Sequence, residues 1–111
     1  MKVSLDLLIR DAKIFDVFRL RTFHGWVGIR DGRFIYVEEG EPPETIKAEE
    51  EHSLDGLMLL PGLIDSHMHI DSSHVTPRRL AEAAVPFGTT TILEDAHEMA
   101  AAGGVAGVQW M

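Results

Sequence analysis

Two histidines separated by one residue, His67 and His69, follow an apolar segment that spans residues 57 to 64. Alternate side chains of an extended strand share one face, so these imidazoles are expected about 6.6 Å apart on the same side. Imidazoles at this spacing can tilt onto one divalent cation, each at about 2.1 Å. The pattern also fits a polar strand end whose imidazoles hydrogen-bond to neighbouring loops. The spacing by itself leaves both interpretations open.

Carboxylates accompany the two histidines. Asp65 and Asp71 continue the same alternation before and after them, and a further group of acidic and imidazole side chains follows the next β-branched segment. We expect Asp65 to orient the ligands rather than to bind the metal. Asp95 could instead cap a helix that begins near His97, and Glu98 could favour that helix through its dipole. Besides the two histidines, the side chains near these strand ends that could support a ligand are Asp65, Asp71, Asp95, His97 and Glu98, and the resemblance described below adds a substrate-pocket role for them.

The composition restricts the chemistry. The 111-residue chain contains no cysteine, so any metal site must use His, Asp or Glu, which suits zinc, manganese or iron(II). Apolar residues make up 45% and charged residues 25%, which is the balance of a folded soluble domain. The net charge of −8 argues against a nucleic-acid partner. The sequence shows neither a signal peptide nor an apolar run of roughly 18 residues, which predicts a cytoplasmic protein without a membrane partner.

The first half of the chain has the pattern of β-structure. Residues 5 to 37 contain alternating and β-branched segments that predict three or four short antiparallel strands. The pair Asp31-Gly32 lies between two such segments and predicts a type I′ hairpin turn, which needs positive φ at both positions. Residues 38 to 52 carry most of the negative charge and are expected to form a solvated acidic loop. We therefore expect residues 1–56 to be part of a small antiparallel β domain.

The second half has a different pattern. The continuous apolar segment from Leu57 predicts a strand covered on both faces, as in a parallel sheet. Thr76-Pro77 predicts the start of a helix with threonine as N-cap, and residues 89 to 94 predict a second strand. A short helix closed by Gly103-Gly104 is expected next. The order strand, helix, strand, helix indicates a parallel α/β arrangement, and the apolar residues at the end suggest that the domain continues.

Three motifs together, PGLIDSHMHIDSS, VPFGTTTILEDAHE and VAGVQWM, resemble the adenine deaminases of the metal-dependent amidohydrolase superfamily. The segments LIRDAKIFDVF and IRDGRFIYV resemble the N-terminal small-domain strands of the same superfamily. The similarity covers nearly the whole chain apart from the acidic segment. It implies an α/β fold: the N-terminal part of a small β-sandwich domain, followed over residues 57–111 by the first two βα units of an incomplete TIM-type (β/α)₈ barrel.

The resemblance also implies a site and a reaction. His67 and His69 match the HxH metal ligands on the first barrel strand, and Asp95, His97 and Glu98 match a D-P-H-E segment that borders the active site in the family. The implied cofactor is a divalent metal, manganese or iron(II) with zinc as an alternative, and it is binuclear in the complete enzyme. The implied reaction is hydrolysis of adenine to hypoxanthine and ammonia. The implied partner is a small purine or cyclic amidine, and the complete enzyme would be a homo-oligomer.

Two positions depart from the family pattern. Asp71 stands where these enzymes usually have glutamate, and Ala96 replaces the proline of D-P-H-E. Both departures bear on the identity of the substrate more than on fold or metal. Family members take a bridging carboxylate, two further histidines and a final aspartate from later strands, which this chain does not contain. We therefore expect the 111 residues alone to be catalytically inactive.

Two alternatives stay open. One is a related cyclic amidohydrolase of the hydantoinase or dihydroorotase type, which would share every feature except the DSS and EDAHE details. The other is a truncated, non-catalytic chain that binds metal weakly or serves as an interaction domain. The remaining histidines follow no ligand pattern and are expected at the surface; they are His24, His52 and His74.

Overall fold

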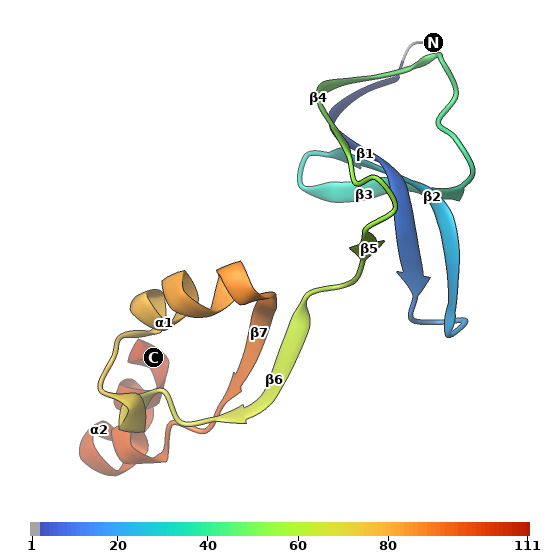
Figure 1. Ribbon diagram of the computed structural model, residues 1–111. Helices are drawn as coiled ribbons and strands as arrows, with labels where there is room; N and C mark the ends of the chain where they lie inside the picture. The colour runs from blue at the N-terminus through green and yellow to red at the C-terminus, as the bar shows by residue number, and fades with distance from the viewer. Residues whose placement is uncertain (1–2) are drawn as a thin grey trace. The chain divides into compact units, whose positions relative to one another are not determined.

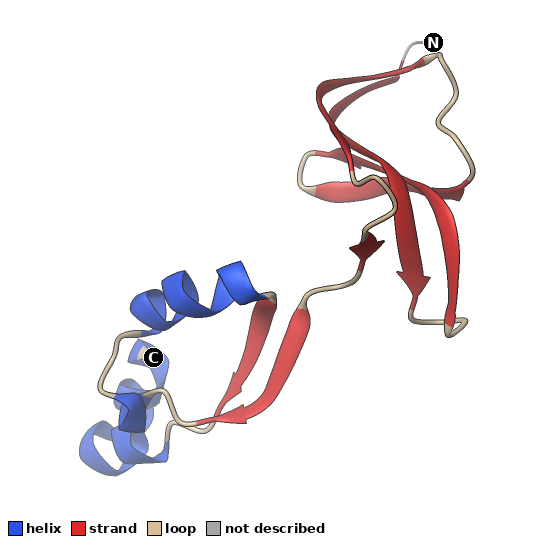
Figure 2. Ribbon diagram, in the orientation of Figure 1, coloured by secondary structure: helices blue, strands red, loops and turns tan. Residues whose placement is uncertain are grey.

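The computed structural model describes residues 3–111, which form two compact units, the first ending at Pro61 and the second running from Gly62 to Met111 (Figure 1). The described chain is a mixed α/β structure made mostly of strands, with two α-helices (Figure 2). Neither helix is long and apolar enough to cross a membrane. The first unit contains β1 (Val3–Asp16), β2 (Arg21–Arg30), β3 (Arg33–Glu39), β4 (Ile46–Ser53) and β5 (Met58–Leu59). The second contains β6 (Leu63–Met68), the 3₁₀ turn η1 (Asp71–Ser73), α1 (Pro77–Ala84), the 3₁₀ turn η2 (Val85–Phe87), β7 (Thr89–Glu94) and α2 (His97–Trp110).

The strands of the first unit form one sheet with the order β3-β2-β1-β4, and β5 also pairs with β1. β1, β2 and β3 are an antiparallel meander, and the turn between β2 and β3 has positive φ at Asp31 (51°) and Gly32 (67°), as the predicted type I′ turn requires. The antiparallel strands predicted for residues 5 to 37 are therefore confirmed, but β4 and β5 run parallel to β1, so the domain expected over residues 1–56 is not antiparallel throughout. The cause is the connection over residues 40 to 45, which returns the chain to the start of β1, where Ile46 pairs with Val3.

The acidic segment over residues 38 to 52 is not the loop that its charge suggested. Its second half belongs to β4, in which Ile46 and Ala48 pack against the core while Glu49 and Glu50 are exposed. Two inward apolar residues at alternate positions are enough to hold a strand against β1. β4 is an edge strand, where charged side chains remain solvated and discourage pairing with other chains.

The core of the first unit is formed by side chains of its two longest strands, β1 and β2. Leu5 is fully buried, and Gly28 must be small because a Cβ atom there would lie 2.7 Å from Cδ1 of Leu5. Trp26 is 3% exposed and packs on Tyr36, with ring centroids 5.1 Å apart. The buried apolar side chains of this unit are Leu5, Leu8, Ala12, Ile14, Trp26 and Val27.

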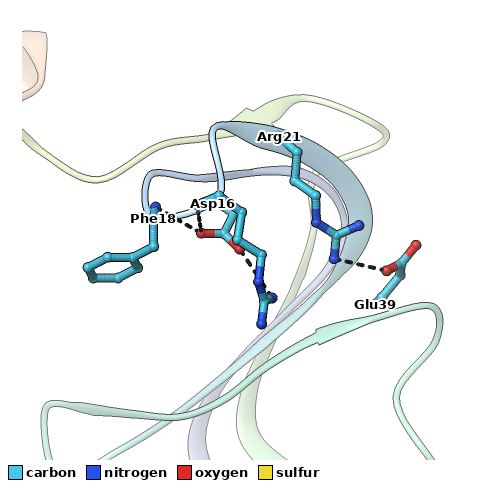
Figure 3. Close-up of polar contacts among 5 residues, drawn as sticks. Asp16, Phe18, Arg21 and Glu39 are labelled. Atoms are coloured by element: carbon cyan, nitrogen blue, oxygen red, sulfur yellow. Dashed lines mark hydrogen bonds and ion pairs between the residues drawn. The ribbon is translucent and has the colours of Figure 1, made fainter.

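Asp16 orders the connection between β1 and β2 (Figure 3). Its Oδ1 accepts hydrogen bonds from the backbone N–H groups of Phe18 at 2.9 Å and Arg19 at 3.1 Å, and its Oδ2 lies 3.4 Å from the Arg19 guanidinium. The bond from the Arg19 backbone is the main cause that lowers the pKa of Asp16. Arg21 pairs with Glu39 at 3.4 Å. The turn is therefore held in place although the Phe18 side chain at its tip is 94% exposed.

The apolar segment from Leu57 does not form one continuous strand, contrary to the prediction. Met58 and Leu59 pair with β1 in the first unit, and β6 begins only at Leu63. Between them, Pro61 has no N–H to donate to a ladder, and Gly62 lies so close to the Thr90 side chain that a Cβ atom would collide with it. The two compact units therefore meet between Pro61 and Gly62 rather than after residue 56.

The second unit is built on two parallel strands, β6 and β7, which are connected through α1. α1 begins as predicted, because the Thr76 side chain accepts a hydrogen bond from the Arg79 N–H at 3.4 Å and Pro77 occupies the first helical position. The turn η2 and Gly88, with φ of 97°, end this helical segment. The Leu63 N–H donates to the Gly88 carbonyl at 2.8 Å, which joins the start of β6 to the entry of β7.

α2 continues beyond the glycines that were expected to close it. The range to Trp110 consists of two helical segments, because Gly104, with φ of 60° and ψ of −147°, has a non-helical backbone and separates them. The second segment then packs back on the first, because Gly107 is buried so close to the Met99 carbonyl that a Cβ atom would collide with it. The prediction of a short helix closed by Gly103-Gly104 is therefore confirmed for the first segment, whereas the second segment up to Trp110 was not predicted. Gly104 can end the first segment because glycine adopts a positive φ without a steric penalty.

Candidate metal centre

His67 and His69 lie together at the carboxyl end of β6. His67 belongs to the strand and is exposed, whereas His69 follows it and is partly buried. Their ring centroids are 4.7 Å apart and the rings are perpendicular. The two imidazoles therefore share one side of the chain, as their alternation predicts.

Asp95, directly after β7, completes a group of three possible donors with these histidines. One donor atom from each of His67, His69 and Asp95 lies within 4.8 Å of the other two. Two ligands that each bind one ion at about 2.1 Å can be at most about 4.2 Å apart, so small side-chain rotations would bring all three atoms to a common ion. The backbone supports this proximity, because the Asp95 N–H donates to the Met68 carbonyl at 3.0 Å.

The backbone carbonyl of Asp95 fixes the orientation of the His69 ring. Nδ1 of His69 lies 2.9 Å from this oxygen, and because a carbonyl can only accept, Nδ1 must carry the proton. Nε2 then keeps its lone pair for a metal, an arrangement typical of histidine ligands. The same bond from the Asp95 carbonyl is the main cause that raises the pKa of His69, and the charges of Asp95, Asp71 and Glu94 add to it against the opposing effect of desolvation.

His97, the first residue of α2, extends the cluster. Its ring is perpendicular to that of His69 with centroids 4.6 Å apart, and its Nδ1 lies 3.9 Å from Oδ2 of Asp95. His97 is not one of the three grouped donors and its side chain is 57% exposed. The imidazole therefore stands at the open edge of the cluster, where a small molecule could reach it.

Asp71 does not join the donors but caps α2 from the neighbouring connection. Its Oδ2 accepts hydrogen bonds from the N–H groups of Glu98 at 3.0 Å and Met99 at 3.2 Å. Desolvation acts to raise the pKa of Asp71, but these bonds, the bond from Ser72 and the nearby His97 outweigh it and lower the pKa. The alternative that Asp95 caps this helix is wrong, because Ala96 occupies the N-cap position and no side chain caps from there.

Asp65 and Glu98 contribute less to the cluster. Oδ1 of Asp65 accepts a hydrogen bond from the backbone N–H of His67 at 3.1 Å, so this carboxylate supports the strand end and lies outside the donor group. Glu98 is exposed in the first turn of α2, where a negative side chain is favoured by the helix dipole. The three other histidines, His24, His52 and His74, are exposed, as their lack of pattern predicts.

Glu94, the last residue of β7, was not among the residues selected from the sequence. Its Oε2 accepts a hydrogen bond from the backbone N–H of Ile70 at 2.7 Å, and its Oε1 is buried without a hydrogen-bond partner in the described part of the chain. Its position at the end of a β-branched strand, directly before Asp95, was the available signal. Its partner is a backbone group 24 residues away, which no local pattern reveals.

Comparison with known proteins gives a consistent set of relatives, although no protein-family model matches the chain. The chain is 44% identical over 106 residues to an adenine deaminase of Halalkalibacterium halodurans, a match that covers 96% of this chain and 18% of that protein. An adenine deaminase of Nitratidesulfovibrio vulgaris is 41% identical over 110 residues, covering 99% of this chain and 18% of that protein. Adenine deaminase 2 of Oenococcus oeni is 39% identical over 96% of this chain and 19% of its own length.

These matches define what the chain corresponds to. It spans about 18% of the length of the curated relatives that it matches, at their N-terminal end. Nearly all of the present sequence is covered, so both compact units have counterparts in proteins named adenine deaminase.

Proposed function

We propose, from this correspondence with adenine deaminases, that the chain supplies the first metal ligands of a hydrolase that converts adenine and water into hypoxanthine and ammonia. The observation that carries the proposal is the group of three donor atoms, from His67, His69 and Asp95, within 4.8 Å of one another. This group lies at the carboxyl ends of two parallel strands. In α/β enzymes with parallel strands this end of the sheet holds the active site.

The second unit has the features of the first two βα units of a (β/α)₈ barrel. β6 and β7 are parallel and adjacent, and each is followed by helical structure. We assign residues 62–111, rather than the 57–111 expected from the sequence, to such a barrel, and residues 1–61, which include β5, to part of a small β-sandwich domain. The support is the strand order, the parallel pairing and the similarity of the relatives, which are about five times as long as the matched part.

The donors fit a divalent metal. Two imidazoles and one carboxylate suit zinc, manganese or iron(II), and three protein ligands leave coordination positions open, as in catalytic rather than structural sites. When bound, the metal would lower the pKa of a water molecule and withdraw charge from the substrate. His67 and His69 would hold it through nitrogen, and Asp95 would hold it through a carboxylate oxygen or accept a proton beside it. We expect manganese or iron(II), as part of a binuclear centre in the complete enzyme.

Other side chains of this unit would serve the substrate or the ligands. His97 offers an exposed imidazole beside His69, which could hydrogen-bond a ring nitrogen of a purine. Asp65 and Asp71 hold the backbone around the ligands, and Glu98 stands at the start of α2. From the similarity to adenine deaminases we expect a cytoplasmic, homo-oligomeric enzyme that acts on a free base, and the net charge of −8 argues against a nucleic-acid partner.

A chimera tests this proposal. Residues 1–111 would replace the matching part of the Halalkalibacterium halodurans adenine deaminase, and ammonia release from adenine would be measured with manganese present. We expect the chimera to release ammonia from adenine. His67→Ala should lower this activity by more than about a hundredfold, because losing a metal ligand costs more than losing a contact that only supports one. His24→Ala should leave the activity unchanged. A folded chimera that hydrolyses a hydantoin but not adenine would contradict the proposed substrate. Equal activity of the His67→Ala chimera would contradict the proposed metal site.

A further inference from the structure

The two connections that carry the candidate donors are not joined by regular strand pairing. β6 and β7 pair at Leu63–Thr89, Ile64–Thr91, Asp65–Ile92 and Met68–Glu94. The register shifts between Asp65 and Met68, where His67 lies, and His69 follows the last pair. A slip of one residue moves a strand by about 3.3 Å. Such a slip would separate donors that must come within about 4.2 Å of each other to share an ion. Beyond the single bond from the Asp95 N–H to the Met68 carbonyl at 3.0 Å, the strand ladder gives these two segments little support, so further contacts are needed to hold them in place.

Glu94 makes the first link between them. Its carboxylate reaches from the end of β7 to the N–H of Ile70, directly after His69, at 2.7 Å. Ile70 is 8% exposed, so its N–H has little access to water, and loss of the acceptor would leave a buried donor unsatisfied. The bond is short and involves a charged acceptor, which makes it one of the stronger kinds of hydrogen bond.

Asp71 makes a second link in the opposite direction. It lies in η1, after β6, and its Oδ2 accepts from Glu98 and Met99 at the start of α2, after β7. The first N–H groups of a helix have no partner within the helix, and the N-cap residue Ala96 cannot supply one. Figure 1 shows the turn after β6 beside the first part of α2.

The two links enclose the donors. Glu94 precedes Asp95 and binds the residue after His69, while Asp71 binds the residue after His97. From these contacts we propose that Glu94 and Asp71 are positioning residues, a reciprocal pair of carboxylates that fixes the register of the two connections and so the distances among His67, His69 and Asp95. The part of this inference that concerns metal affinity rests on the proposed function. The part that concerns register does not depend on it.

Two substitutions of Glu94 distinguish its role as a hydrogen-bond acceptor for Ile70 from the effect of its negative charge. Glu94→Ala removes the acceptor for the Ile70 N–H, whereas Glu94→Gln keeps one carbonyl oxygen at similar reach. The amide nitrogen of the glutamine would then occupy the buried position of Oε1, which has no partner among the described residues. We expect Glu94→Gln to restore the bond to Ile70 in part. Glu82→Ala is the matched control, because Glu82 is in the same unit but pairs with Arg78 and Arg79 on α1.

The experiment has two readouts on the full 111-residue chain. The first, without metal, is nitrogen-15 NMR: the hydrogen exchange of the Ile70, Glu98 and Met99 amides, together with the ring signals of the histidines. The second is a titration with Co²⁺, which reports affinity and the ligand field through its visible absorption. Asp71→Asn and Asp71→Ala are measured in the same way, so that the conclusion does not depend on one variant that fails to fold.

We expect Glu94→Ala to lose exchange protection at Ile70, to shift the ring signals of His67 and His69, and to weaken Co²⁺ binding by about 10- to 100-fold. Glu94→Gln should recover protection and part of the affinity, and Glu82→Ala should match the unsubstituted chain. Unchanged ring signals and unchanged Co²⁺ affinity in Glu94→Ala would overturn the inference while leaving the metal site intact. Shifted ring signals in a chain that binds no Co²⁺ would support the positioning role and overturn the metal site instead.

Discussion

The two units of this chain differ in where they bury apolar surface and where they place reactive side chains. Among the residues whose burial the structure describes, seven apolar ones are buried: six, from Leu5 to Val27, belong to the unit that ends at Pro61, and Ile70 is the seventh. The grouped donors all lie in the unit that starts at Gly62. In that unit the large apolar side chains of Phe87 and Trp110 are 86% and 68% exposed.

The difference follows from the way each sheet is made. An antiparallel meander with tight turns buries one face with residues that are close in sequence, so the first unit forms a core from about sixty residues of chain. Two parallel strands need cover on both faces, which normally comes from further strands and helices. The relatives have such additional chain, since the present sequence matches only 18% of their length. The comparison shows that the contacts within one short unit can bring the candidate donors together although that unit buries little apolar surface.

The largest effect should come from the core of the first unit. Leu5→Ala removes a fully buried side chain and is expected to lower the free energy of unfolding of that unit by about 2–5 kcal/mol. Phe87→Ala, at an 86% exposed position of the second unit, should leave stability nearly unchanged. Urea denaturation measures both: the fluorescence of Trp26, in a Trp110→Phe background, follows the first unit, and far-ultraviolet circular dichroism follows the second unit, which contains both α-helices. A loss on Phe87→Ala as large as that on Leu5→Ala would show that the second unit has a core of its own.

The second prediction concerns the reactive unit and pH. With His69 as a metal ligand, as proposed, a proton would compete with the metal for its Nε2. The bond to the Asp95 carbonyl raises the pKa of this histidine above its ordinary 6.5. Affinity for Co²⁺ should therefore begin to fall above pH 6.5 and decrease roughly tenfold per pH unit below the pKa of His69, as for any ligand that must lose one proton. Co²⁺ titrations of the chain at about one-unit steps between pH 8 and pH 5 measure this decrease in affinity. Affinity that stays constant to pH 5, roughly 1.5 units below an ordinary imidazole pKa, would rule His69 out as a ligand.

A smaller effect is expected at Asp71. The pKa of Asp71 is lowered in the folded chain. The ionised carboxylate therefore stabilises the start of α2 fully at pH values above its ordinary pKa of 3.8, and this contribution is lost as the pH falls through the lowered pKa. Exchange protection of the Glu98 and Met99 amides should decrease over that acidic range. Asp71→Asn should show weaker protection at neutral pH and no such acid step. An identical acid step in Asp71→Asn would assign it to another group, and Glu82→Gln serves as the matched control.

Local patterns were sufficient for part of this structure. The Asp31-Gly32 turn, the Thr76-Pro77 helix start and the strand over residues 89 to 94 follow from residue types at adjacent positions. The shared side of His67 and His69 follows from strand alternation. These features were predictable because the physical cause and its effect lie within a few residues of each other.

Other features depend on contacts that no short segment contains. β4 is a strand because Ile46 and Ala48 meet the core, although the glutamates around them suggested a loop. The cap of α2 comes from Asp71, 27 residues before Glu98, and the role of Glu94 depends on a backbone group 24 residues away. The second segment of α2, after Gly104, packs on the first where Gly107 approaches Met99. Sequence patterns indicate which groups are reactive, but non-local contacts decide which of them support the others.

The most direct test of the account is X-ray absorption of the Co²⁺-loaded chain, compared with His67→Ala, His69→Ala and the exposed control His24→Ala. We predict two imidazole nitrogens and one carboxylate oxygen at about 2.1 Å, a loss of one imidazole in each ligand variant and an unchanged spectrum in the control. A spectrum with oxygen neighbours only, or one that His67→Ala and His69→Ala leave unaltered, would contradict the assignment of this cluster as a metal centre.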